Sequence, residues 1–206
     1  MHQTRQELTP KVPLARKGTK YVARALNHHR NSVPIVIALR DMLHLARTAR
    51  EVNEMIKQKM LKLNGKIVTD YRESIRLFNL LEAGKNYRLT LLPTGKFTFE
   101  PVSEKEGRLC KVLNKTLAAK DIFQLHLHDG TTLLTKEKII VGDSLVLDEA
   151  GKIKKHLPLI AGKKVLVITG SYAGTHANIK TSQGKTVTVS FANKEATLDK
   201  QSVIVL

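Results

Sequence analysis

The chain has 206 residues, enough for one to three small modules, and carries 35 Lys and Arg against 18 Asp and Glu, a net charge of +17. Apolar residues make up 42% and aromatic residues 4%, which allows aliphatic cores and excludes a wholly disordered chain, a collagen or a disulfide scaffold. The single cysteine, Cys110, favours a reducing compartment. No apolar run reaches the roughly 18 residues of a membrane span, so we expect none. The charge excess therefore points to a polyanion.

Residues 1–34 hold seven Lys and Arg against one acid, Glu7, and show no sustained apolar period. The segment predicts an extended basic N-terminal arm that cannot fold alone and that becomes ordered on a phosphate backbone. A merely solvated tail is the alternative, and a membrane-surface role is weaker because no apolar helical face accompanies the charges. The candidate RNA-binding residues here are Arg16, Lys17, Lys20, Arg24, His28, His29 and Arg30.

Residues 35–85 predict two helices and a hairpin. An apolar face at helical spacing (Leu39, Met42, Leu43, Ala46) indicates the first helix, which begins after Pro34. The capping-box spacing from Thr48 to Glu51 predicts the start of the second, whose buried stripe is Ala49, Val52 and Ile56. Asn64-Gly65 between alternating apolar residues is a strong hairpin signal.

The string from residue 37 to residue 70, IALRDMLHLARTAREVNEMIKQKMLKLNGKIVTD, resembles the small RNA-binding domain of small-subunit ribosomal protein four of the archaeal and eukaryotic type. Further landmarks follow the family's order: RKGTKY at 16–21, LCKV at 109–112, LHDG at 127–130 and HLPL at 156–159. The resemblance covers roughly residues 12 to 206 and is closest to the archaeal form, with some divergence. It places Thr48, Arg50, Lys62, Asn64, Gly65, Lys66 and Asp70 at motif positions, and Arg47 and Lys57 complete the candidate contacts of this module.

Residues 86–160 predict a β-rich central domain of short strands, with examples at 97–99, 109–113 and 123–128. His126 and His128 lie two apart, but the alternation of Phe123, Leu125 and Leu127 assigns them to the polar face, and no further ligand stands at metal spacing. We therefore expect no metal and no cofactor. The lone thiol in a predicted strand is expected to be structural, and the sequence contains no catalytic constellation.

Residues 161–206 predict short strands at 165–169, 177–181, 185–190 and 202–206, as in a small closed barrel. A lysine pair, an apolar strand, Gly170-x-x-x-Gly174 and a second strand are similar to the KOW motif of ribosomal and transcription-elongation proteins. That resemblance implies an SH3-like barrel whose loop meets RNA backbone, with Lys163, Lys164, Tyr172 and Thr175 as contacts. Ala177 departs from the glycine usual in the family.

The sequence thus predicts an α+β, mostly β protein of four segments: 1–34, 35–85, 86–160 and 161–206. The resemblance implies a non-enzymatic structural constituent of the small ribosomal subunit, located in the cytoplasm within the ribosome. Its expected partners are small-subunit rRNA and neighbouring ribosomal proteins, without a membrane, a small-molecule substrate or a second copy of the chain. The alternatives are a transcription- or translation-associated RNA-binding factor and, with less support, an accessory module of an RNA-modifying enzyme.

Overall fold

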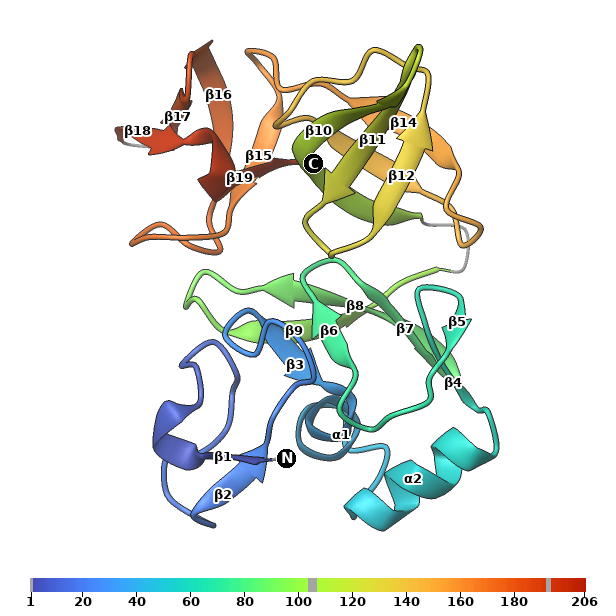
Figure 1. Cartoon of the computed structure of the whole chain (residues 1–206). Helices are drawn as coiled ribbons and strands as arrows, with labels where there is room; N and C mark the ends of the chain where they lie inside the picture. Colours follow the sequence, from blue (N-terminus) through green and yellow to red (C-terminus); the bar gives the residue numbers. More distant parts are fainter. Residues whose placement is uncertain (1, 104–106, 192–193) are drawn as a thin grey trace. The chain divides into compact units, whose positions relative to one another are not determined.

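The computed structural model describes residues 2–103, 107–191 and 194–206, and the chain divides into two compact units, Met1–Glu106 and Gly107–Leu206 (Figure 1). Strands are the predominant regular structure in both units, and the helices are short. The predicted mostly β, α+β class is therefore confirmed. No helix among the described residues is both long enough and apolar enough to cross a bilayer.

The N-terminal segment is folded rather than extended. Strand β1 (His2–Thr4) pairs antiparallel with β2 (Tyr21–Ala23), and the 3₁₀ turn η1 (Arg5–Glu7) follows β1. Val12, in the connecting loop, and Val22 and Ala25 are buried. The expectation of an extended arm is wrong here because isolated apolar residues, without a helical or strand period, still fill separate positions in the unit's core.

The first predicted helix is shorter than its apolar pattern. Strand β3 (Ser32–Pro34) pairs with β6 (Ser74–Arg76) and leads into α1 (Ile35–Ile37), which widens at once into the π-helical turn η2 (Ala38–Met42). The amide of Leu43 donates to the carbonyl of Ala38, five residues back. This wider turn rotates the predicted stripe, so the core is built by the continuous buried run 35–39.

The second helix and the hairpin form as predicted. Helix α2 (Ala49–Lys57) begins after Thr48 and buries Val52. Strands β4 (Leu61–Leu63) and β5 (Lys66–Ile67) meet at a two-residue turn, where Asn64 has φ of 52° and Gly65 has φ of 79°. Positive φ at both central positions is the requirement of the type I′ turn that Asn-Gly favours.

A five-stranded antiparallel sheet in the order β5-β4-β7-β8-β9 completes the first unit, with β7 (Leu80–Ala83), β8 (Lys85–Leu91) and β9 (Phe97–Pro101). Leu61, Leu81 and Leu89 are fully buried on its inner face. The predicted strand at 97–99 forms as β9, but it pairs with β8 in the first unit. The expected boundary at residue 85 therefore falls inside a continuous sheet.

The second unit contains two five-stranded antiparallel sheets. The first has the order β12-β11-β10-β13-β14, and its buried cluster includes Cys110, Leu125 and Leu145. Its strands are β10 (Arg108–Ala119), β11 (Ile122–Leu127), β12 (Thr132–Thr135), β13 (Ser144–Leu147) and β14 (Ile153–Leu157).

The second sheet has the order β18-β17-β16-β15-β19 and is open. Its strands are β15 (Lys164–Val167), β16 (His176–Gln183), β17 (Thr186–Ser190), β18 (Glu195–Asp199) and β19 (Val203–Val205). In the described part of the chain, its outermost strands β18 and β19 do not pair with each other, so the expectation of a closed barrel is wrong. Strand β18, which the sequence did not predict, occupies one edge.

The other edge of this open sheet is strand β19, and side chains of the first sheet of this unit cover it. The Nζ atom of Lys111 on β10 donates to the carbonyls of Lys200 and Val203, at 2.6 Å each, and Ser144 Oγ on β13 accepts from the amide of Val205 at 3.1 Å. Lys111 is 1% exposed. Two side chains thus satisfy backbone groups that a neighbouring strand would otherwise have to pair.

The Lys111 contact gives a pH dependence with a definite sign. Burial lowers the pKa of Lys111 from 10.5 to about 8, so between these values the unfolded chain binds more protons than the folded chain. Relative to Lys111→Met, the free energy of unfolding of the original chain should therefore rise by roughly 2–3 kcal/mol between pH 8 and pH 10.5. Chemical denaturation across this range measures it. Lys138→Met, at an exposed lysine, is the control, and its difference in free energy of unfolding from the original chain should not change over this pH range. If the difference for Lys111→Met is equally independent of pH, the lowered pKa of Lys111 is contradicted.

Candidate nucleic-acid interface

Many acidic side chains of the described chain are used in internal contacts. Asp143 accepts hydrogen bonds from the amides of Ile140 and Leu159 and pairs with His156 at 2.8 Å. Glu73 caps a turn by accepting from the amides of residues 69 and 70. Asp129, whose side chain is fully buried, pairs with Arg108 at 2.8 Å. These acids neutralise few of the surface cations.

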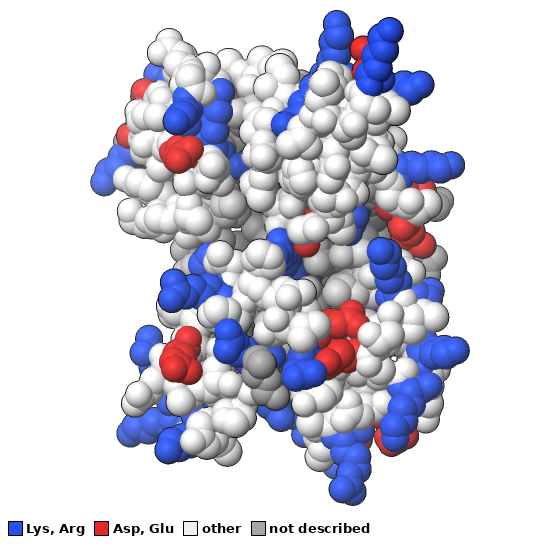
Figure 2. Space-filling view, in the orientation of Figure 1, with Lys and Arg blue, Asp and Glu red and all other residues white. Residues whose placement is uncertain are grey.

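The basic side chains show the opposite distribution. Figure 2 shows Lys and Arg projecting from both units on the visible face, with smaller acidic areas between them. Nine of the predicted contacts are exposed and, among the residues that the structure describes, enter no ion pair: Arg16, Lys17, Lys20, Arg30, Arg47, Arg50, Lys66, Lys163 and Lys164.

Arg5 holds the basic loop at 15–20 in place. Its guanidinium donates to the carbonyl of Ala15 at 2.6 Å, to the carbonyl of Thr19 at 2.8 Å and to the hydroxyl of Thr19 at 2.9 Å. Gly18 has φ of 139°, and a Cβ there would lie 2.9 Å from Arg5 Nη2. Arg5 could not be predicted from the sequence, because its partners lie 10 and 14 residues away and no motif links them.

The other N-terminal candidates differ in the internal contacts that their side chains make. Lys20 Nζ lies 5.3 Å from the centroid of the Tyr21 ring. Arg24 and His29 lie near Glu7, whose pKa is lowered chiefly by the amide and hydroxyl of Thr4 and to a smaller extent by these two neighbours. His28 adopts φ of 49° in a turn and is exposed. Arg24 therefore has a partial internal counter-charge.

The start of α2 separates structural from free residues. Thr48 Oγ1 accepts from the amide of Glu51 at 3.2 Å, and the Glu51 carboxylate accepts from the amide of Arg47 at 2.7 Å. The latter bond is the main cause that lowers the pKa of Glu51. Thr48 thus acts as the helix cap, while the guanidinium groups of Arg47 and Arg50 lie exposed on either side of it. Lys57 pairs with Glu54 at 3.0 Å.

The β4–β5 hairpin also contains both residues with internal contacts and an exposed cation. Asn64 Oδ1 accepts from the amide of Leu80 at 2.9 Å, and the Asn64 amide donates to the Leu80 carbonyl at 2.8 Å. This side chain therefore fastens the turn to β7. Lys62 pairs with Glu82 across the sheet at 2.9 Å, whereas Lys66 is exposed beside the turn.

In the second unit, Lys163 and Lys164 are exposed at the start of β15. Tyr172 stacks on Phe191 with ring centroids 4.7 Å apart, and the Thr175 hydroxyl donates to the Tyr172 carbonyl at 2.6 Å. These two side chains therefore shape the loop that follows β15. Ala177 is buried in regular pairing with Val165, so the strand accommodates its Cβ without a glycine.

The histidines and the cysteine of the first sheet make strand contacts. His128 Nδ1 accepts from the amide of Lys111 at 3.1 Å, and His126 Nε2 lies 3.4 Å from the hydroxyl of Thr116. No group of three or more metal-ligating side chains gathers in the described residues. Burial, followed by the nearby carboxylate of Asp129, raises the pKa of the Cys110 thiol far above its usual range, so this thiol is not a nucleophile.

A mostly β chain with a net charge of +17 and with exposed cations outside every ion pair of the described residues belongs to the class of basic proteins that bind a polyanion. Ribosomal family S4e matches it over residues 83–153. Small ribosomal subunit protein eS4 of Methanocella arvoryzae is 30% identical over 175 residues, covering 82% of this chain and 75% of the relative. The corresponding protein of Natronomonas pharaonis is 31% identical, covering 84% and 77%.

The solved structures agree with these relatives. The crystal structure of the 30S ribosomal protein S4e from Thermoplasma acidophilum matches with a TM-score of 0.73 and 25% identity, covering 85% of this chain and 95% of that one. The chain belongs to the ribosomal S4e family. The resemblance drawn from the sequence is therefore confirmed.

The Arg5 contacts predict a local effect on the basic loop. Arg5→Gln removes hydrogen bonds that glutamine cannot reproduce, so trypsin should cleave the segment 15–20, which contains Arg16, Lys17 and Lys20, several-fold faster while the sheets stay intact. Limited proteolysis with mass spectrometry measures this change. Lys11→Gln, on the same segment, is the comparison, and an unchanged cleavage rate in Arg5→Gln would show that the loop is held by other contacts.

Proposed function

We propose that this chain is a structural constituent of the small ribosomal subunit that binds and stabilises folded small-subunit rRNA through its phosphate backbone. Membership of a ribosomal protein family supports the assignment, and the family is not one of enzymes. The chain would then act in the cytoplasm as part of the ribosome, with rRNA and neighbouring ribosomal proteins as partners.

The exposed, unpaired cations are the observation that carries the mode of binding. Each Lys or Arg that reaches a phosphate releases a condensed counterion, which provides a sequence-independent driving force. The deep major groove of an RNA helix is closed to side chains, so shape rather than base identity would govern the address. The proposed primary contacts are Arg16, Lys17, Lys20, Arg30, Arg47, Arg50, Lys66, Lys163 and Lys164.

The remaining predicted contacts have internal partners and are proposed as secondary contacts or supports. Thr48, Asn64 and Thr175 hold backbone groups, Tyr172 stacks on Phe191, and Lys57 and Lys62 pair with carboxylates. The same holds for Arg24 and His29 near Glu7, while His28 is exposed and able to donate.

We further infer that the C-terminal segment carries a KOW-type RNA-binding loop. The exposed lysine pair precedes the buried strand β15, and Gly170 and Gly174, with φ of 83° and 84°, bound the loop that leads to β16. The four segments 1–34, 35–85, 86–160 and 161–206 would then be contact regions distributed over the two compact units.

Backbone contact predicts a change in salt dependence. Lys17→Gln and Lys66→Gln should each make the plot of log affinity against log salt shallower by roughly one unit, with no change in which RNA is preferred. Filter binding to small-subunit rRNA between 50 and 200 mM salt measures the slope. Lys154→Gln is the matched control because Lys154 already pairs with Asp148, and an altered RNA preference in either test variant would contradict backbone recognition.

Ribosomal assembly predicts co-sedimentation. In sucrose gradients of native lysate, the chain should migrate with the small subunit at moderate salt, and a combined variant at Arg47, Arg50 and Lys66 should shift toward the light fractions. Far-UV circular dichroism and the Tm of the variant establish that it is folded. A chain found only in light fractions would instead support a transient RNA-binding factor.

A further inference from the structure

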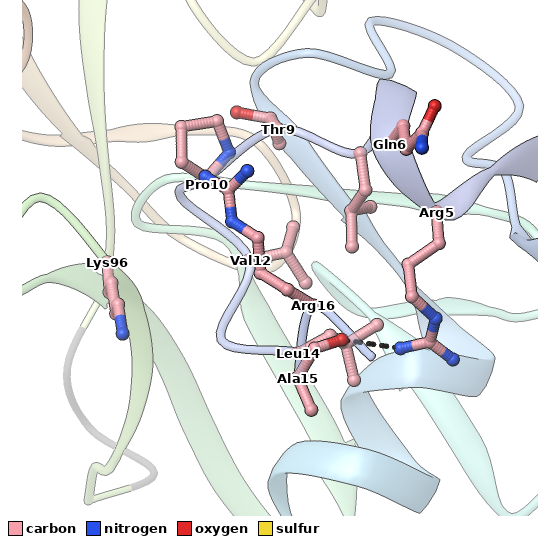
Figure 3. A pocket seen from close by; sticks show the side chains of 10 residues that line it. Arg5, Gln6, Thr9, Pro10, Val12, Leu14, Ala15, Arg16 and Lys96 are labelled. Atoms are coloured by element: carbon pink, nitrogen blue, oxygen red, sulfur yellow. Dashed lines mark hydrogen bonds between the residues drawn. The ribbon is translucent and has the colours of Figure 1, made fainter. Parts of the chain in front are cut away.

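A pocket of about 310 Å³ opens beside the basic loop of the first unit (Figure 3). Its walls come from the segment 5–16 and from Lys96, in the turn between β8 and β9. The amide of Phe97 donates to the carbonyl of Lys11 at 2.7 Å, which fixes the segment against the start of β9. The pocket is therefore built by two parts of the chain that a backbone hydrogen bond holds together.

The chemistry of the lining is two-sided. Val12 is 4% exposed and Leu14 is half-buried, so they form an apolar wall. Arg5, Arg16 and Lys96 supply three cations, and no acidic side chain is among the ten described residues that line the pocket. The guanidinium of Arg5 is engaged by the carbonyl of Ala15, as the dashed bond in Figure 3 shows, whereas Arg16 and Lys96 are exposed.

A ligand for such a site needs a flat or apolar body and a negative charge. A pocket of 310 Å³ lies at the lower end of the range of about 300–1,000 Å³ typical of small-molecule sites, which suits a body the size of a nucleotide. Unpaired RNA bases that leave their stack are held by side-chain planes, among them those of Arg guanidinium groups. Arg16 and Pro10 both line the pocket, so a guanidinium plane and a proline ring are both available to it (Figure 3).

We propose that this pocket receives a single unpaired nucleotide of the bound RNA, with its base against Val12 and Leu14 and its phosphate at Arg16 and Lys96. The inference rests on the proposed function, because the nucleotide belongs to the rRNA that the chain binds. It adds one base-holding site to a surface that otherwise contacts phosphates. With only nine aromatic residues in the chain, an aliphatic pocket replaces a stacking platform.

The test is chemical probing of all four bases of small-subunit rRNA bound to the full chain. Leu14→Trp fills the pocket, and Leu117→Trp makes the same substitution at an exposed leucine of the second unit. Arg16→Gln removes the phosphate partner without adding bulk, and Lys154→Gln removes a charge that already pairs with Asp148 and does not line the pocket. The Tm of each variant establishes that it is folded.

We expect one base, unpaired in the RNA, to be protected by the original chain and by the two controls, and to become reactive with Leu14→Trp and Arg16→Gln. All other protections should persist, and Leu14→Trp should bind about tenfold more weakly. If the pocket variants leave every protection unchanged, the pocket proposal fails while the proposed function stands. If the original chain protects no base and does not bind the rRNA, the proposed function fails and the pocket proposal fails with it.

A nucleotide in this pocket has two possible sources, RNA and the free monomer. Titration of the free chain with AMP, GMP, CMP and UMP, observed through the methyl NMR signals of Val12 and Leu14, separates them. Saturation at micromolar concentrations by one monomer would overturn the RNA-linked assignment. Shifts only at millimolar concentrations, with loss of the base protection in Leu14→Trp, support it.

Discussion

The structure depends on an uneven use of charge. With a net charge of +17, the folded chain must hold many cations together, yet several of its carboxylates serve as caps, turn anchors and partners inside the fold. Asp129 illustrates this, because it is buried with Arg108 rather than paired with a surface lysine. A bound polyanion would relieve the repulsion that remains at the surface, so the proposed RNA binding would be thermodynamically linked to the stability of the folded chain.

Basic residues fall into two groups with different physical roles. Arg5 and Lys111 donate to backbone carbonyls and join segments that lie far apart in the sequence, and in these positions a cation replaces the pairing that a strand would supply. The second group, exemplified by Lys17 and Arg50, is exposed and has no internal counter-charge in the described chain. Composition alone cannot separate the groups, because burial and hydrogen bonding decide which cations remain available to a phosphate.

Local chemistry explains which parts of the fold the sequence predicts. The cap from Thr48 to Glu51 and the Asn64-Gly65 turn were predictable because each depends on residues within a few positions of one another. The folded N-terminal segment was not, because the contacts of Arg5 span 10 and 14 residues. The contacts of Lys111 at β19 span 89 and 92 residues, for which no periodic pattern exists.

In the candidate interface, too, the sequence predicts local contacts, and family resemblance adds the positions of candidate residues. Family resemblance marks positions without stating why a residue stands there, and the structure shows that Thr48 and Asn64 bind backbone groups while Arg50 and Lys66, two positions further on, are exposed. The polar residue of each pair fixes the local backbone conformation, and this conformation places the cation two positions later. In the proposed interface, a substitution at Thr48 or Asn64 would therefore weaken RNA binding through the placement of its neighbour, and the cap and the turn would act as supports of the cations that meet phosphates.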